Sequence, residues 1–271
     1  VVAGAGVALR LTRPLERLAR GAARLEAGEY GLRLAGEGRD EFGRLTRAFN
    51  SLSAGLSREQ AARRAMVADI AHDLRTPVSV LRSRLEALQD GVVTPGPAVV
   101  AGLIDQTLLL GRLVEDLRTL SLADVNALDL HPEPLDVTAF LEALVPAWPG
   151  VRLALPAPGL AVTADRARLA QALGNLLANA AAHGAPPVEV GAAAEGRGAR
   201  FWVRDHGPGL PAGEEQAVFE RFRRLDPARG RSGGSGLGLA IVKALAQAHG
   251  GRVEAANAPG GGAGFTLHLP G

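Results

Sequence analysis

Apolar residues recur at helical spacing through the first half of the chain. Over residues 11–27, and again over 42–56, they step alternately by three and four positions, the period that places them on one face of a helix. A glycine-containing connector, residues 28–39, separates the two runs. Two short amphipathic helices cannot bury their apolar stripes alone, so we expect them to pair with a second copy of the chain. The stripes consist of Leu11, Leu15, Leu18, Ala22 and Leu25, and of Phe42, Leu45, Phe49, Leu52 and Leu56.

A helical hairpin is predicted next, over residues 58–122. Residues 58–65 favour a helix but lack an apolar stripe, which indicates that the helix continues while its packing phase changes. The first arm runs to about Asp90, and a turn over residues 91–97, with two prolines, ends it. The second arm carries a stripe from Leu103 to Leu120. Two such arms bury their stripes best in a four-helix bundle, which requires a dimer.

The pattern changes after residue 122, where short alternating runs typical of strands are separated by helical runs. Strands are predicted over residues 151–155, 188–190, 200–203 and 264–269, and residues 131–135 indicate an entrance strand or a linker. The clearest helix of this half runs from Asp165 to about Ala182. The predicted fold is therefore multidomain: an all-α N-terminal region with a dimeric four-helix bundle, followed by an α+β sandwich.

Composition and charge narrow the classes of function. The formal net charge is only +2, and the arginines are interleaved with acidic residues, so we expect no binding of nucleic acid. The chain has no cysteine, which excludes disulfides, thiolate metal sites and thiol catalysis. The six histidines are scattered, with no pair at the spacing of metal ligands.

An apolar run opens the chain, interrupted by Arg10 and followed by Arg13. It is too short to cross a bilayer, which takes about 20 residues in a helix. We expect residues 1–10 to be the end of a truncated transmembrane helix, with the arginines on its cytoplasmic side. The alternative is an amphipathic lead-in to the first helix.

His72 is a candidate nucleophile on the first arm of the hairpin. It lies two positions before Leu74, about 200° around the helix from the apolar stripe, so we expect it to face solvent. A carboxylate such as the neighbouring Asp73 can hold one imidazole nitrogen while the other attacks, and histidine titrates near neutral pH. Alone, the same pattern fits an ordinary surface histidine.

Asn175 and Asn179 stand four residues apart in the predicted 165–182 helix and therefore share one face. An amide oxygen is a neutral ligand for Mg²⁺ that leaves the charge of the cation for bound phosphates. A pair of amides can equally cap or bridge neighbouring helices.

Asp205, Gly207 and Gly209 follow a predicted strand. A carboxylate there can accept a hydrogen bond from an adenine amino group, while the glycines let the backbone approach the base. An ordinary turn has the same composition. Further on, Phe219 and Phe222 lie beside arginines, which suits a flap with an apolar foot and a cationic edge, or the core packing of a short helix.

A glycine-rich loop, residues 233–238, precedes an apolar helix. Backbone N–H groups at such a helix N-terminus bind phosphate oxygens. A dinucleotide-binding loop would follow the first strand of a βαβ unit, whereas this loop lies late in its domain. The loop therefore favours phosphate binding of another kind.

In this order the motifs resemble those of a two-component sensor histidine kinase along nearly the whole chain. Residues 11–57 resemble a HAMP linker, with Pro14, Gly28 and Asp40 among its landmarks. Residues 58–122 resemble a dimerisation and histidine phosphoacceptor hairpin, and residues 123–271 resemble an ATP-binding domain of the Bergerat type. The resemblance implies ATP-dependent phosphorylation of a histidine, transfer to the receiver domain of a response regulator, and a homodimer at the inner (cytoplasmic) membrane of a bacterium, with these residues facing the cytoplasm.

The resemblance also implies residue roles. His72 would be the phosphorylated histidine, Asp73 the adjacent acid, and Thr76 a residue that orients water for a phosphatase activity toward the regulator. ATP and Mg²⁺ are the implied cofactors, with Asn179 as the metal ligand. The implied nucleotide-binding residues are Asn175, Asn179, His183, Asp205, Gly207, Gly209, Phe219, Phe222, Arg223, Gly234, Gly236, Leu237 and Gly238.

The chain departs from the family pattern at Ala182, where many relatives carry Lys or Arg. Arg223 or Arg224 on the flap would supply the missing cation. Two other classes of protein stay open: a catalytically silent dimeric scaffold that only senses nucleotide, and an ATPase of the chaperone or mismatch-repair kind. The His72–Asp73 pair argues against the first, and the histidine-bearing hairpin against the second.

Overall fold

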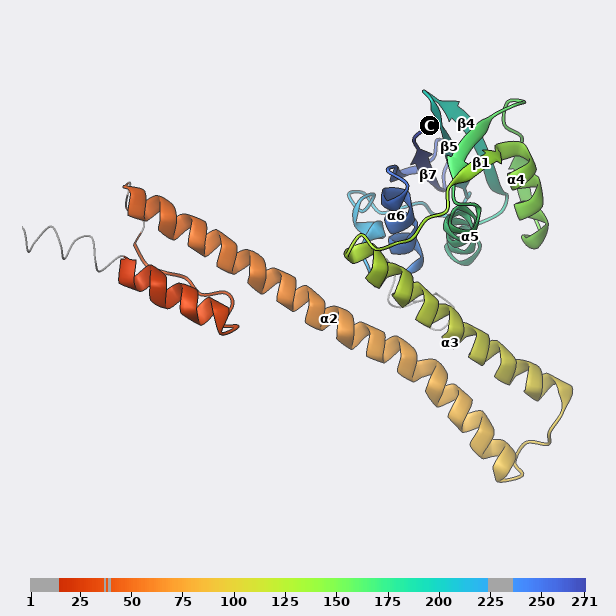
Figure 1. Cartoon of the computed structure of the whole chain (residues 1–271). Coiled ribbons are helices and arrows are strands. Elements are labelled where there is room, and N and C mark those ends of the chain that lie inside the picture. The colour runs from red at the N-terminus through yellow and green to blue at the C-terminus, as the bar shows by residue number, and fades with distance from the viewer. Residues whose placement is uncertain (1–14, 37, 39, 224–235) are drawn as a thin grey trace, which may run out of the picture. The chain divides into compact units, whose positions relative to one another are not determined.

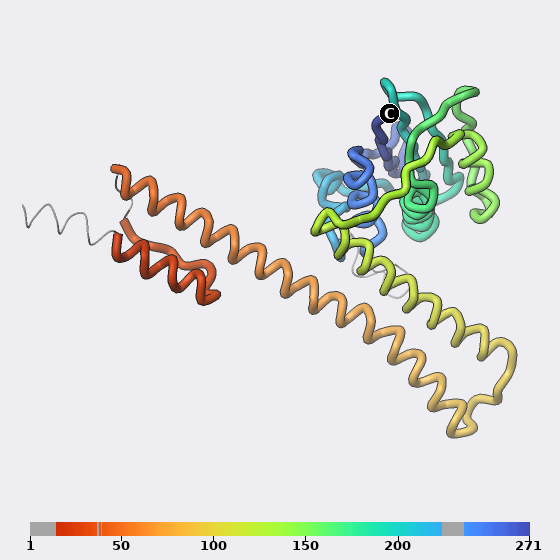
Figure 2. The backbone as a smooth tube through the Cα atoms, in the orientation of Figure 1, coloured from red at the N-terminus to blue at the C-terminus, as the bar shows by residue number. Residues whose placement is uncertain are grey.

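The computed structural model describes residues 15–36, 38, 40–223 and 236–271 (Figures 1 and 2). The expected membrane-helix end at residues 1–10 lies outside the described residues, as do Arg224 and Gly234. The chain divides into two compact units, Val1–His72 and Asp73–Gly271. Helix α2 (Glu41–Gln89) begins in the first unit and ends in the second.

The first unit contains a helix over residues 15–26, the connector, and the N-terminal part of α2. Asp40 caps α2, because its Oδ1 accepts a hydrogen bond from the N–H of Gly43 at 2.8 Å. The helix continues without interruption through residues 58–65, as the sequence predicts, and includes Pro77. Both predicted helices of this region are therefore present.

The connector packs on a polar face of α2. The N–H of Leu34 donates to Asn50 Oδ1 at 2.8 Å, and Asn50 Nδ2 donates to the carbonyl oxygen of Leu34 at 3.0 Å. Thr46 and Ser53 on the same helix are buried, whereas the stripe residues Leu45 and Leu52 are 50% and 58% exposed. Leu45 and Leu52 are thus open in the single chain, as expected for a surface that pairs with a second copy, whereas the stripe residues Phe42, Phe49 and Leu56 are half-buried.

Helix α3 (Pro97–Asp124) forms the second arm of the hairpin. Leu113, Thr119 and Leu120 near its end are buried, while Ile104 and Leu108 are exposed. Among the described helices it alone is long and apolar enough to cross a membrane, although an arm of a dimeric bundle has the same composition. Burial raises the pKa of Asp116 on this helix to about 6, against the opposing effect of the Arg112 guanidinium.

The second unit also contains two sheets. In the smaller, β1 (Glu133–Asp136) pairs antiparallel with β3 (Ala161–Ala164). The larger has five strands in the order β2-β4-β5-β7-β6, with β2 and β4 parallel and the other neighbours antiparallel. Its strands are β2 (Val151–Ala154), β4 (Val188–Glu195), β5 (Gly198–Arg204), β6 (Arg252–Asn257) and β7 (Ala263–Leu269).

Three helices form a layer beside the large sheet: α4 (Val137–Leu144), α5 (Arg166–His183) and α6 (Gly238–Ala248) (Figure 1). Buried residues from both layers form one core, in which the ring of Phe140 meets that of Phe201 edge-on at 6.5 Å between centroids. Short 3₁₀ turns, η1 (Val145–Ala147) and η2 (Ala217–Phe219), complete the unit. The α+β prediction is confirmed, with an entrance strand at β1.

Asp165 fixes the start of α5. Its carboxylate accepts hydrogen bonds from the N–H groups of Ala167, Arg168 and His131 at 2.9, 3.0 and 2.9 Å. Burial raises the pKa of Asp165, but these backbone donors outweigh it and lower the pKa overall. The cap therefore fixes the helix that carries both candidate asparagines.

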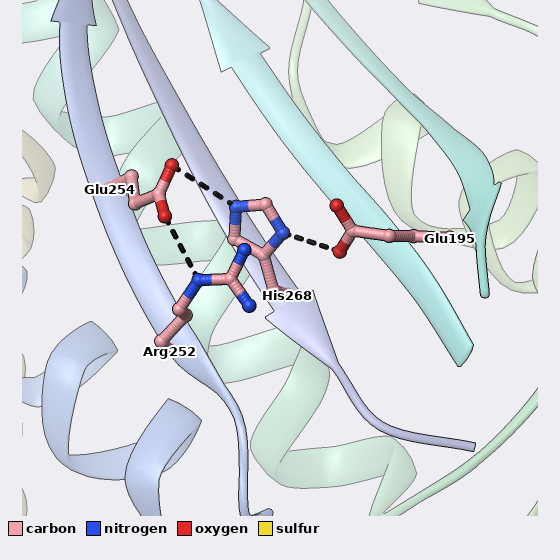
Figure 3. Close-up of polar contacts among 4 residues, drawn as sticks. All are labelled: Glu195, Arg252, Glu254 and His268. Atoms are coloured by element: carbon pink, nitrogen blue, oxygen red, sulfur yellow. Dashed lines mark hydrogen bonds and ion pairs between the residues drawn. The ribbon is translucent and has the colours of Figure 1, made fainter. Parts of the chain in front are cut away.

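A charged cluster lies on the face of β7 turned away from the core (Figure 3). His268 Nδ1 is 2.5 Å from Glu195 Oε2, and its Nε2 is 3.5 Å from Glu254 Oε2. Arg252 Nε donates to Glu254 at 2.9 Å. The hydrogen bond with His268 lowers the pKa of Glu195, and that with Arg252 lowers the pKa of Glu254.

Candidate functional site

Asp205 is a buried carboxylate at the end of β5, only 4% exposed. Its Oδ1 accepts hydrogen bonds from the N–H of Gly207 at 2.8 Å and of Ala263 at 3.3 Å. Its own N–H donates to the carbonyl oxygen of Ala263 at 2.9 Å. The carboxylate is therefore held rigidly by its own loop and by the first residue of β7.

Three glycines lie so close to Asp205 or to one another that none of these positions could carry a side chain. A Cβ at Gly184 would lie 2.5 Å from Asp205 Cβ, and one at Gly207 would lie 2.8 Å from Gly184 Cα. A Cβ at Gly262 would clash with the carbonyl oxygen of Asp205. These close contacts, which we call the glycine cradle, explain why glycine stands at positions 184, 207 and 262 and show that the backbone packs directly around the carboxylate.

Gly209 takes the left-handed conformation, with φ of +76°, and a Cβ there would lie 2.5 Å from Asn257 Oδ1. Gly207 and Gly209 thus both have a steric reason to be glycine. Gly184 and Gly262 were not among the residues predicted from sequence, because each lies in a separate segment and only the fold brings it to Asp205.

Asn175 and Asn179 are half-buried on successive turns of α5. Asn175 Nδ2 donates a hydrogen bond to the carbonyl oxygen of Gly238, the first residue of α6, at 3.3 Å. Asn175 therefore bridges two helices, which is the structural role that an amide pair can also have. His183 ends α5 and, like Ala182, is exposed.

The described part of the glycine loop, residues 236–238, leads directly into α6. Gly236 has φ of +69°, and its carbonyl oxygen accepts a hydrogen bond from the N–H of Phe222 at 3.0 Å. Leu237 is 1% exposed, so its side chain anchors the loop in the core. Gly236 and Gly238 lie at the N-terminus of α6, where their backbone can face phosphate oxygens.

The two aromatic residues of the flap pack inward. Phe219 is buried, and its ring meets that of Phe265 edge-on at 6.2 Å between centroids. Phe222 is half-buried against the core and has φ of +58°, uncommon for a residue with a side chain. The rings are thus the apolar foot of the segment that continues into residues 224–235.

The two described arginines of the flap, Arg221 and Arg223, each form an ion pair with an acidic residue. Arg221 contacts both carboxylate oxygens of Asp124, with Nη1 2.7 Å from Oδ2. Arg223 Nη2 lies 2.6 and 2.8 Å from the two carboxylate oxygens of Glu214. These hydrogen bonds raise the pKa of Arg223 further above its usual range. Glu214 was not predicted, because it stands in an irregular segment without any sequence motif.

His72 is exposed on α2, as the helical spacing predicts. Asp73 follows it and is half-buried, and Thr76 lies one turn further on and is exposed. These three residues are carried by the same continuous helix. The structure thus gives the imidazole the solvent access that a nucleophile needs.

Three family models match the chain in succession. Residues 6–58 match the HAMP domain, and residues 62–125 match the His Kinase A (phospho-acceptor) domain. Residues 164–271 match the histidine kinase-, DNA gyrase B-, and HSP90-like ATPase. The three matches follow one another in the order that the motifs predict.

Two curated relatives match nearly the whole chain. The signal transduction histidine-protein kinase BaeS of Escherichia coli is 39% identical over 96% of this chain and 58% of its own length. The histidine-protein kinase/phosphatase MprB of Mycolicibacterium smegmatis is 36% identical over 100% of this chain and 58% of its own. The chain thus spans little more than half the length of these relatives.

A solved structure agrees with this assignment. The histidine kinase AdeS of Acinetobacter baumannii is 30% identical, with a TM-score of 0.62 over 73% of this chain and 96% of that one. The part of this chain that aligns with AdeS is longer than any one of the three matched domains. Together with the phospho-acceptor and ATPase matches, it shows that the chain belongs to the family of two-component sensor histidine kinases.

Proposed function

We propose that the protein is an ATP-dependent histidine kinase that phosphorylates its own His72 and passes the phosphoryl group to an aspartate of a response regulator receiver domain. One observation carries the proposal: an exposed histidine in the segment that matches the phospho-acceptor domain accompanies a buried carboxylate in a glycine cradle within the segment that matches the ATPase. Neither feature alone requires a kinase. Their combination supplies both a nucleophile and a nucleotide site.

The nucleotide would lie along α5 and α6. Asp205 would accept a hydrogen bond from the adenine amino group through its Oδ2. Backbone N–H groups already donate to its other carboxylate oxygen, Oδ1, and fix the orientation of the side chain. Gly207 and Gly209 would shape that pocket, with His183 at its margin. The backbone of the 234–238 loop and the flap would hold the phosphates, with Phe219 and Phe222 fixing the foot of the flap.

Magnesium fits this site only together with a nucleotide. Among the described residues no group of three or more His, Cys, Asp or Glu side chains could hold a metal ion. A half-buried amide such as Asn179 offers one oxygen, and Mg²⁺ commonly takes its remaining ligands from phosphates and water. We assign Asn179 as the protein ligand, where the cation would neutralise phosphate charge.

At His72 the unprotonated ring nitrogen would attack the γ-phosphorus, forming an N–P bond as the bond to the leaving ADP breaks. Asp73 would orient the ring and favour the cation that develops on it. Positioning and charge neutralisation provide most of the rate in phosphoryl transfer, so the protein needs no other covalent step. Thr76 would orient water for dephosphorylation of the regulator, an activity that the name of the relative MprB, a kinase/phosphatase, includes.

The exposed apolar residues of α2 and α3 support a homodimer. Val78 and Leu85 on α2, and Ile104 and Leu108 on α3, are each about half exposed in the single chain. A second copy would cover these exposed residues in a four-helix bundle, in which Ile104 and Leu108 lie on a face of α3 beside the predicted stripe rather than on it. We further propose the domain limits 11–57, 58–122 and 123–271, and attachment to the inner membrane of a bacterium through a segment that ends within residues 1–10.

The central proposal is tested by incubating the chain with ATP labelled at the γ-phosphate. We expect label on the protein that is lost in acid and is absent from the His72→Gln variant. His131→Gln is the matched control, because His131 is an exposed histidine outside the phospho-acceptor match. Label that survives the His72→Gln change would refute the proposal, and nucleotide binding without any label would favour the silent scaffold.

A further inference from the structure

The described cations expected near the phosphates of a bound nucleotide already have acidic partners. Position 182, just before the end of α5, holds alanine rather than a cation. The two described flap arginines, Arg221 and Arg223, each contact a carboxylate of the protein itself. Arg224 lies outside the described residues. A ligand with several negative charges would therefore meet cations that already have acidic partners.

Arg223 is the flap arginine that lies against the glycine loop. The N–H of Phe222, its neighbour, donates to the carbonyl oxygen of Gly236 at 3.0 Å. A Cβ on Gly236 would lie 3.3 Å from the carbonyl oxygen of Arg223. Two residues further on, Gly238 accepts a hydrogen bond from Asn175. The backbone of Arg223 is thus part of the same contiguous group as the expected phosphate-binding loop.

The contact between Arg223 and Glu214 has the geometry of phosphate recognition. Nη2 lies within hydrogen-bonding distance of both carboxylate oxygens, and Nε donates to Oε2 at 3.2 Å. Arginine binds carboxylate and phosphate oxygens through the same planar fork. The side chains of Arg223 and Glu214 are 42% and 26% exposed. Water therefore reaches the pair, and an ion pair of this kind is easily exchanged for another.

We propose that Glu214 holds Arg223 in the absence of nucleotide, and that the terminal phosphates of a nucleoside triphosphate replace the carboxylate as the partner of this arginine. Glu214 would then compete with the phosphates of the nucleotide for Arg223. It would lower the affinity most for a nucleoside triphosphate, less for a diphosphate, and not at all for a nucleoside. It would also hold the side chain of Arg223 in an extended fork close to where those phosphates bind. This inference rests on the proposed function, because it requires that the site bind ATP.

The test measures the affinity of the full chain, with Mg²⁺ present, for three probes: a non-hydrolysable ATP analogue, ADP and adenosine. Glu214→Gln keeps the size of the side chain but removes its charge, so we expect up to about fivefold tighter binding of the ATP analogue, the range of an exposed ion pair. The effect should be smaller for ADP and absent for adenosine. Glu215→Gln is the matched control, since Glu215 is the adjacent half-buried acid.

A double-mutant cycle links the effect to the arginine. Arg223→Ala should weaken binding of the ATP analogue but not of adenosine, and adding Glu214→Gln to it should change nothing further. Glu214→Ala serves as a second variant, with thermal unfolding of each variant followed in parallel. Unchanged or weaker binding of the analogue to Glu214→Gln, or equal gains for adenosine, would overturn the inference alone. Failure of the parent chain to bind any of the three probes would overturn the proposed function as well.

Discussion

The side-chain amide of Asn175 donates a hydrogen bond to the carbonyl oxygen of Gly238 and so joins the middle of α5 to the first residue of α6. Asn179, one turn later on the same face, has the same chemistry and the same half-buried setting. The two amides nevertheless have separable roles in our proposal. Asn175 shapes the loop that meets the phosphates, and Asn179 binds the metal.

Replacing Asn175 should therefore affect stability as well as binding. Asn175→Ala leaves the carbonyl oxygen of Gly238 without this donor, and we expect it to lower the free energy of unfolding by about 1 kcal/mol. Asn179→Ala should abolish phosphorylation of His72 with a smaller change in stability. Chemical denaturation and labelling with ATP, run on both variants, separate the two effects. An unchanged unfolding free energy for Asn175→Ala would show that the bridge contributes nothing.

The glycine cradle can be tested with one methyl group. Gly184→Ala would bring a Cβ to 2.6 Å from the carbonyl oxygen of Ala180 as well as against Asp205, so the carboxylate that we propose to bind adenine must move. We expect nucleotide affinity to fall about tenfold or more, the equivalent of about 1.4 kcal/mol.

Gly174→Ala, within helix α5 and ten residues before Gly184, provides the control for that experiment. The nearest atom to its added Cβ is in Trp148, 3.8 Å away, which is ordinary contact. Because alanine favours a helix over glycine, this variant should be more stable by about 0.5–1 kcal/mol and bind nucleotide normally. Equal affinities for the two variants would argue against the cradle.

Asp116 should make stability fall as the pH rises. Its pKa in the folded chain, about 6, is above the ordinary value of 3.8, so between these two values the folded state binds more protons than the unfolded state. Asp116→Asn should therefore raise the free energy of unfolding at pH 7 by about 1 kcal/mol, after allowance for solvent screening, and have little effect near pH 4. Denaturation at both pH values measures this. Asp105→Asn, on an exposed position of the same helix, should change stability by less than about 0.5 kcal/mol.

The Glu195–His268 contact should act in the opposite direction. The hydrogen bond with His268 lowers the pKa of Glu195 from 4.5, so the stabilisation is complete above that value and is lost as the pH falls through the lower, folded-state pKa. Glu195→Gln should make the unfolding free energy less dependent on pH in this acidic range. Glu189→Gln, on the same strand, is the control. Parallel pH profiles for wild type and Glu195→Gln would contradict the assignment.

Several elements were predictable because their side chains alternate clearly or keep one helical face. Strands β5 and β7 place Phe201, Val203, Phe265 and Leu267 in the core at every second position, and the sequence displays that period. Strands β3 and β6 and helix α4 were not predicted. Strand β3 has four residues and β6 contains two alanines in six, so neither shows a clear alternation of apolar and polar residues from which a strand could be predicted. Helix α4 has only eight residues and opens with two β-branched ones, which favour strands.

The site was predictable where one motif contains all its chemistry, as with Asp205 and the two glycines that follow it. Its remaining parts come from distant segments. Gly184 and Gly262 contact Asp205 only through the fold, and Glu214 meets Arg223 across nine residues of irregular chain. No local pattern marks a residue whose importance depends on a neighbour supplied by tertiary structure.

Helix α2 presents two different faces: Asn50 contacts the connector of its own chain, and two exposed leucines are available to a partner. Asn50 holds the connector of its own chain through both hydrogen bonds to Leu34, while Leu45 and Leu52 point elsewhere and are open to a partner. Because both faces belong to one helix, a rotation of α2 relative to its connector would move both faces by the same angle. In the homodimer that we propose, the contact within each protomer and the packing between protomers would therefore change together whenever α2 turns against its own connector.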